Sequence, residues 1–225
     1  MAATTTDQDK RSILQKFKET GFVYITGWIV LIWVLEVSDT VLLGDRLQRQ
    51  GIKPRSVDGL DGVLWAPFLH DGFGHLISNT FPFIVLGALV AIRGRSHWLL
   101  VTASSIAVGG ILTWIFARSG NHIGSSGVVF GYLGALIGAA VFERKLAYIA
   151  PAVIAIFFYG SIFVGLVPQN RVSWEGHLAG LVAGAAATYV LSKRRKAKTL
   201  EPTTGTGADG LTLPNGLSEL DDWQL

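Results

Sequence analysis

The sequence contains no cysteine and few charged residues. Because none of its 225 residues is a cysteine, a disulfide framework, a thiol nucleophile and cysteine-ligated metal or iron–sulfur sites are excluded. Charged residues make up only 16% of the chain, whereas hydrophobic residues make up 50% and the mean hydropathy is +0.43. This balance is typical of an integral membrane protein. Because the chain has no thiol, any chemistry that it performs uses oxygen and imidazole groups.

The basic residues form no continuous face. The net charge is +3 and the pI is about 9.3, yet Lys and Arg stand in short clusters beside apolar segments. Such clusters indicate how the chain is oriented in a membrane, and they do not predict binding to nucleic acid. Residues 1–20 are polar and lack the apolar core of a signal peptide, so we interpret them as a cytoplasmic tail. Residues 193–225, rich in Thr, Gly, Pro and acidic residues after a basic start, predict a disordered cytoplasmic tail.

Between these tails, residues 21–192 predict an all-α polytopic membrane domain of six transmembrane helices. A helix crosses a hydrocarbon layer of about 30 Å at 1.5 Å per residue, and each apolar segment is long enough to do so. The predicted spans are 21–43, 67–92, 97–116, 125–142, 146–167 and 174–192. Glu36 and Asp39 share a face of the first span, and we interpret them as inward-facing or interfacial groups, not as a catalytic pair.

The distribution of Lys and Arg predicts the orientation of these spans. With six spans both termini lie on one side, and that side holds thirteen of the nineteen basic residues, against six in the opposite loops. Basic residues are enriched in cytoplasmic segments, so we expect cytoplasmic termini. Spans two, four and six then run inward from the outer face.

Polar side chains stand in the outer part of these three spans. His75 and Asn79 are four residues apart and share a helix face, Ser126 lies at the start of the fourth span, and His177 lies near the start of the sixth. A serine, an imidazole and a pair of hydrogen-bond donors are the groups that acyl transfer requires. The small residues around them also suit close helix packing; they are Gly124, Gly127 and Gly131 around Ser126, and Gly176, Gly180 and Gly184 around His177.

Over residues 20–192 the chain resembles the rhomboid intramembrane serine proteases of bacterial type. The resemblance rests on three motifs in order, namely His75-Leu76-Ile77-Ser78-Asn79, Gly124-Ser125-Ser126-Gly127, and His177 followed by Gly180. It implies a six-helix rhomboid-like bundle in which Ser126 is the nucleophile and His177 is the general base. It also implies an oxyanion hole of His75, Asn79 and Ser126, supported by Gly124, Gly127, Phe130 and Gly180.

The resemblance further implies a serine–histidine dyad with no catalytic acid, no cofactor and no metal. Glu175 is two residues from His177 and would not share its helix face. Substrates would be transmembrane proteins, cut near the outer surface of a bacterial plasma membrane. The physiological substrate and the oligomeric state stay open.

Two positions depart from the family pattern. The Trp-Arg pair that many members carry before the second span is absent, since Trp65 is followed by Ala66. The support of this loop must therefore differ. The aromatic residue four positions after Ser126 is Phe130 where many members have tyrosine, so it can stack under the His177 ring but cannot donate a hydrogen bond.

Three alternatives remain. A catalytically inactive rhomboid-like protein that binds membrane clients would share the same scaffold. A metal-dependent enzyme or transporter could use His70, His75, His122 and His177, although no His-Glu-x-x-His motif occurs. His122, in the loop before Ser126, is a rival for the general base; as a loop residue we expect it to be exposed to solvent or to line the cavity.

Overall fold

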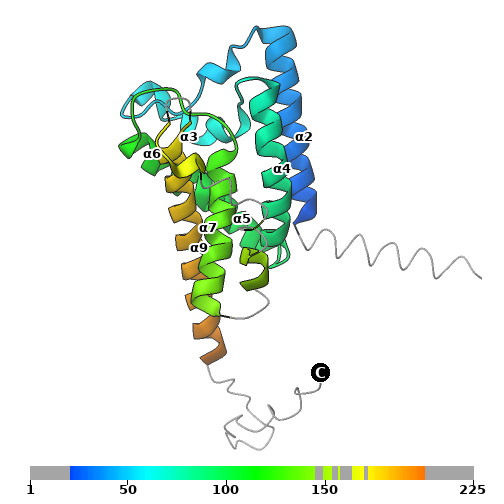
Figure 1. Cartoon of the computed structure of the whole chain (residues 1–225), viewed down its shortest axis with the longest axis vertical. Coiled ribbons are helices and arrows are strands. Elements are labelled where there is room, and N and C mark those ends of the chain that lie inside the picture. The colour runs from blue at the N-terminus through cyan, green and yellow to red at the C-terminus, as the bar shows by residue number, and fades with distance from the viewer. Residues whose placement is uncertain (1–20, 145–148, 154–156, 158–163, 170–171, 201–225) are drawn as a thin grey trace, which may run out of the picture.

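The computed structural model describes residues 21–144, 149–153, 157, 164–169 and 172–200. Within these ranges the chain is nearly all helical, with no strand, and its long helices run side by side (Figure 1). The predicted all-α membrane class is confirmed. Helices α4, α7 and α9 begin at the same end of the bundle, where loops cover the helix ends (Figure 1).

Within the described ranges, four helical stretches are long and apolar enough to cross a membrane. They are α2 (Phe22–Ser38) with the π turn η1 (Asp39–Leu43), α4 (Gly72–Ala91), α5 (Arg95–Ser104) with η5 (Ser105–Gly109) and α6 (Gly110–Phe116), and α7 (Ser126–Glu143). Helix α9 (Trp174–Leu200) packs along α7. It is not one of these four stretches, because Glu175, His177 and its glycines make it less apolar than they are. The predicted span 146–167 lies largely outside the described residues, so the count of six remains a prediction.

Two helix boundaries differ from the sequence prediction. The second span begins at Gly72, because residues Ala66–Phe68 form the short 3₁₀ helix η4, Leu69 is extended, and Gly72 has a φ of 85°. His70 therefore lies in the connection before α4. Helix α9 continues to Leu200, beyond the predicted end at residue 192, so the basic cluster that was assigned to a tail is helical.

Glycine lets α7 and α9 approach closely, as the small-residue pattern predicts. A Cβ atom on Gly180 would collide with the backbone carbonyl of Gly127, and one on Gly184 would collide with that of Gly131. Without these side chains the two backbones touch, so the starts of α7 and α9 are held at a fixed distance. This contact positions the side chains described below.

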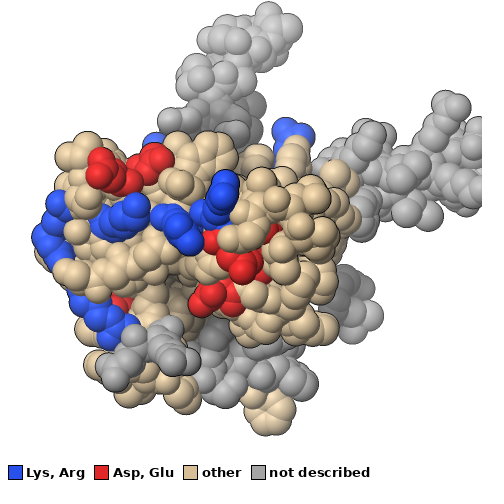
Figure 2. Space-filling view, turned by 90° about the horizontal axis from the view of Figure 1, so that it is seen from above, with Lys and Arg blue, Asp and Glu red and all other residues tan. Residues whose placement is uncertain are grey.

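Loop 44–66 is held to the neighbouring loop and helix end by hydrogen bonds to main-chain groups. Ile52 and His122 exchange two backbone hydrogen bonds of 2.9 Å. The Arg55 guanidinium donates to the carbonyl of Ile115 at 3.1 Å and to that of Ala117 at 2.7 Å, at the end of α6. These bonds support the loop where the Trp-Arg pair is missing. Seen from this end, acidic and basic side chains are interspersed (Figure 2), as expected of a surface in water.

The two carboxylates of the first span face inward. Asp39 and Glu36 are buried, and Asp39 accepts backbone hydrogen bonds from Leu47 at 2.9 Å and Gln48 at 3.2 Å. Asp39 thus anchors the start of loop 44–66, a role that the predicted inward-facing position did not specify.

Candidate active site

Ser126, the first residue of α7, faces the first turn of α9. Its Oγ lies 2.9 Å from Nε2 of His177. The contact of Gly127 with Gly180 sits beside this pair and sets the separation of the two helices. A hydroxyl at this distance from an imidazole nitrogen can pass its proton to the ring as it attacks a carbonyl carbon.

The other side of His177 is fixed by two contacts. Nδ1 lies 2.8 Å from the carbonyl oxygen of Gly165, and because a carbonyl only accepts, Nδ1 carries the proton and Nε2 is left as the acceptor that faces Ser126. The ring stacks on Phe130 with centroids 4.3 Å apart and planes at 11°, as the sequence predicts. The imidazole therefore has one tautomer and one orientation.

The hydrogen bonds of Ser125 distinguish it from its neighbour Ser126. The Ser125 side chain is fully buried. Its Oγ donates to the Pro67 carbonyl at 2.6 Å and accepts from Trp28 Nε1 at 3.2 Å. The Ser125 backbone N–H points at Nε2 of His70, 3.4 Å away. Ser125 thus joins α7 to the segment before α4 and has no access to a substrate.

His70 acts as a neutral acceptor in this junction. Burial, helped by the neighbouring His75, lowers the pKa of His70 from 6.5 to about 3. The ring is therefore uncharged at neutral pH, as its position opposite the Ser125 N–H requires. We assign His70 a structural role.

His75 and Asn79 lie on α4, next to Gly124 in the loop before Ser126. A Cβ on Gly124 would come within 2.7 Å of His75 Nε2 and 3.6 Å of Asn79 Nδ2, so only glycine lets the backbone before Ser126 approach these groups. His75 Nδ1 accepts from the Asp71 backbone N–H at 3.3 Å, which leaves Nε2–H as a donor. Asn79 Nδ2 donates to the His75 carbonyl at 2.9 Å and has a second hydrogen to offer.

One cavity of about 710 Å³ joins these groups. Ser126, His177, His75, Asn79 and Phe130 all line it. The first-turn N–H groups of α7 point toward the same end, where a helix carries partial positive charge. The four polar side chains that the sequence singles out therefore share one space.

His122 lines this cavity and is not exposed to solvent, with 8% of its surface accessible. Its Nδ1 lies 2.6 Å from Ser173 Oγ, and its Nε2 lies 3.0 Å from the Arg118 carbonyl. Both ring nitrogens are occupied away from Ser126, so the geometry does not support His122 as the general base.

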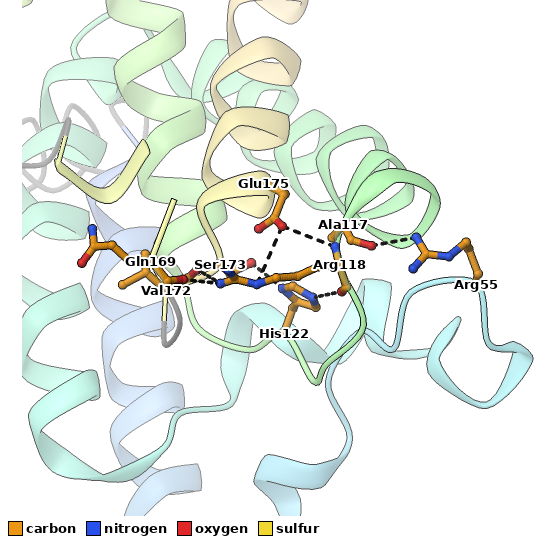
Figure 3. Close-up of polar contacts among 8 residues, drawn as sticks. All are labelled: Arg55, Ala117, Arg118, His122, Gln169, Val172, Ser173 and Glu175. Carbon is orange, nitrogen blue, oxygen red and sulfur yellow. Dashed lines mark hydrogen bonds and ion pairs between the residues drawn. The ribbon is translucent and has the colours of Figure 1, made fainter. Parts of the chain in front are cut away.

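Arg118 ties the loop before α7 to the loop before α9 (Figure 3). Its guanidinium donates to the Gln169 carbonyl at 2.6 Å and to the Val172 carbonyl, and it pairs with Glu175 at 3.7 Å. Glu175 is therefore engaged with Arg118. Gln169 in turn donates from Nε2 to the Val164 carbonyl at 2.8 Å, next to Gly165. Sequence reasoning missed this network because its partners are remote in the sequence.

The histidines do not gather into a metal-binding group. Among the residues that the structure describes, no three His, Cys, Asp or Glu side chains lie close enough together to hold an ion. His70 and His75 are neighbours, with ring centroids 5.2 Å apart. His122 and His177 each bond to the separate partners described above.

Comparison with known proteins gives one family. The Rhomboid domain family model matches residues 60–194. An uncharacterized protein of Mycobacterium tuberculosis is 40% identical over 192 residues, which cover 80% of this chain and 80% of that protein. One of Mycobacterium leprae is 36% identical over 192 residues, 80% of this chain and 76% of that protein. Rhomboid protease GluP of Bacillus subtilis is 30% identical over 192 residues, 81% of this chain and 37% of that protein.

Proposed function

Since the chain belongs to the rhomboid family and is an integral membrane protein, we propose that it is a serine endopeptidase that cleaves transmembrane segments of other proteins. Ser126 is the nucleophile and His177 is the general base. The observation that carries this proposal is the 2.9 Å hydrogen bond between Ser126 Oγ and His177 Nε2. It joins the two groups that the reaction needs, with the ring nitrogen as acceptor.

The reaction proceeds in two halves. Ser126 Oγ attacks the scissile carbonyl carbon while His177 Nε2 takes the hydroxyl proton. The imidazolium then gives this proton to the leaving amine, and an acyl-enzyme remains. Water attacks the ester, again with His177 as base, and releases the carboxylate product with free Ser126. The Gly165 carbonyl, which accepts from Nδ1–H, stabilises the imidazolium in place of a carboxylate.

The negative charge that develops on the carbonyl oxygen has donors on two helices. His75 Nε2–H, the second hydrogen of Asn79 Nδ2 and the Ser126 backbone N–H at the start of α7 form the oxyanion hole. Preorganised donors lower the barrier because they need no rearrangement as the charge forms. The approach of Gly124 to His75 and Asn79 supports this assignment.

Rhomboid family membership and the apolar helices support a membrane-protein substrate. A space of about 710 Å³ at the loop end accommodates a short unwound peptide, and we expect small residues at the cleavage site. The basic-residue distribution favours a plasma membrane protein with cytoplasmic termini and a site that opens outward.

The test is cleavage of a single-span substrate by the full chain purified in detergent. Wild type and Ser125→Ala should yield two fragments, whereas Ser126→Ala and His177→Ala should yield none. If wild type binds such substrates without cutting them, the chain is an inactive rhomboid-like protein that holds membrane clients. Loss of activity on metal chelation would instead favour a metal-dependent reaction.

A further inference from the structure

A second cavity lies at the other end of the bundle, away from Ser126. It has a volume of about 410 Å³ and lies where α4 ends, α5 begins and α9 continues past the predicted span. Its lining is Arg93, Gly94, Arg95, Ser96, His97 and Arg195. Arginine and imidazole groups dominate this lining, and the proposed protease mechanism uses none of them.

His97 is a buried polar side chain with no partner in the part of the chain that the structure describes. Only 3% of its surface is accessible, and neither Nδ1 nor Nε2 has a hydrogen-bond partner there. A buried donor without a partner is unfavourable, because it has lost its hydrogen bonds to water. Because His97 lines the cavity, a bound group with acceptor oxygens would satisfy it.

The cavity also meets the start of a long helix. Helix α5 begins at Arg95 and continues through η5 and α6 to Phe116, and its N-cap, Gly94, makes no side-chain cap. The Gly94 N–H donates to the Ala91 carbonyl at 2.9 Å and the His97 N–H to the Gly94 carbonyl at 3.1 Å. Arg95 and Ser96 therefore supply the first-turn N–H groups that a helix start leaves open, and such a start carries partial positive charge. Anions bind at helix starts for this reason.

Among the described residues around the cavity, basic groups outnumber acidic groups. Arg93 is paired with Glu143, whose carboxylate also accepts from Ser192 Oγ at 2.8 Å. Arg93, Arg195 and Glu143 all act electrostatically on His97. Arg95 and Arg195 are exposed and line the cavity. In the described part of the chain, three guanidinium groups and one carboxylate thus lie at or next to it.

We propose that this cavity binds a phosphate group, with Arg95, Arg195 and His97 as its ligands. The cavity lies at the ends of membrane helices, which is the depth of lipid headgroups, and basic pockets between such helices bind anionic headgroups. The same chemistry would accept inorganic phosphate, and the experiment separates the two sources. The site is independent of the protease reaction.

The test measures the Tm of the full chain in detergent micelles by tryptophan fluorescence. Phosphatidylglycerol is compared with a diacylglycerol galactolipid, which has no phosphate, and sodium phosphate with sodium chloride at equal ionic strength. At ten times its Kd, phosphatidylglycerol should raise Tm by about 3–6 °C. The galactolipid should not. If sodium phosphate gives the full rise and the lipid adds nothing, free phosphate is the ligand.

Variants assign the effect to the cavity. Arg95→Gln combined with Arg195→Gln should raise the apparent Kd at least about tenfold. Arg194→Gln is the matched control, because Arg194 is an exposed neighbour on the same helix and does not line the cavity. The proposal is overturned if phosphatidylglycerol and sodium phosphate both leave Tm unchanged, if the galactolipid gives the same rise, or if the double variant responds like Arg194→Gln.

Discussion

At the scale of single residues, hydrogen bonds give two adjacent serines different surroundings. The Ser125 hydroxyl is bonded to Pro67 and Trp28, whereas the Ser126 hydroxyl faces His177. The resemblance to the family's Gly-x-Ser-Gly motif singles out Ser126, whereas the hydrogen bonds of Ser125 could be seen only in the structure. The contacts of His70 with Ser125 could not be predicted, since they depend on a turn before α4.

The oxyanion role of His75 and Asn79 is testable at this scale. His75→Ala and Asn79→Ala should each lower kcat by about 10²–10³, or roughly 2.7–4 kcal/mol, because the lost bond forms as charge develops. The measurement is kcat on a model transmembrane substrate, with Tm recorded for each variant, since unpaired partners cost about 1–3 kcal/mol of stability. Variants that keep kcat, or lose it only in proportion to folding, would show that the pair is structural packing.

At the scale of helices, we expect the proposed activity to depend on the close contact of α7 with α9. Gly180→Ala places a methyl group against the Gly127 carbonyl, so it should lower the free energy of unfolding by about 1–3 kcal/mol. It should also lower kcat at least about tenfold, because Ser126 and His177 are forced apart. Gly27→Ala on α2, where a Cβ meets nothing within 4 Å, is the control and should change stability by less than about 1 kcal/mol. Equal behaviour of the two variants would contradict this account.

The Arg118 network also acts at this scale. It holds the segment that presents the Gly165 carbonyl to His177. Arg118→Gln removes the bonds to the Gln169 and Val172 carbonyls and should lower kcat about tenfold to a hundredfold with little change in KM. Glu175→Gln keeps those carbonyl bonds and should lose less. The readout is the split between kcat and KM at matched Tm. An unchanged kcat in Arg118→Gln would refute the positioning role.

The sequence predicts helices and their facing residues better than it predicts the connections. Apolar length and the glycine spacing locate α7 and its packing face. The sequence predicts too early a start for α4, because Pro67 and Leu69 are apolar although Pro67 lies in η4 and Leu69 is extended, and the helix begins only at Gly72 with its positive φ. Arg118 escaped notice because its partners Gln169 and Glu175 are near it only in space.

At the scale of the whole molecule, the direction of α4, α7 and α9 determines the side on which the site opens. All three begin at the loop end that carries the cavity (Figure 1). A reporter fused to the C-terminus of the full chain should be active as a cytoplasmic fluorescent protein and inactive as a phosphatase that needs an outer location. The opposite pattern would contradict the topology argued from thirteen basic residues against six.

The central claim is that Ser126, activated by His177, is the nucleophile of this membrane protein. The most direct measurement is covalent labelling of the detergent-purified chain by a fluorophosphonate, with the modified residue identified by mass spectrometry. Wild type and Ser125→Ala should be labelled on Ser126, His177→Ala should react at least about a hundredfold more slowly, and Ser126→Ala should stay unlabelled. Labelling of Ser126→Ala at the wild-type rate, or modification of Ser125 in wild type, would contradict the account.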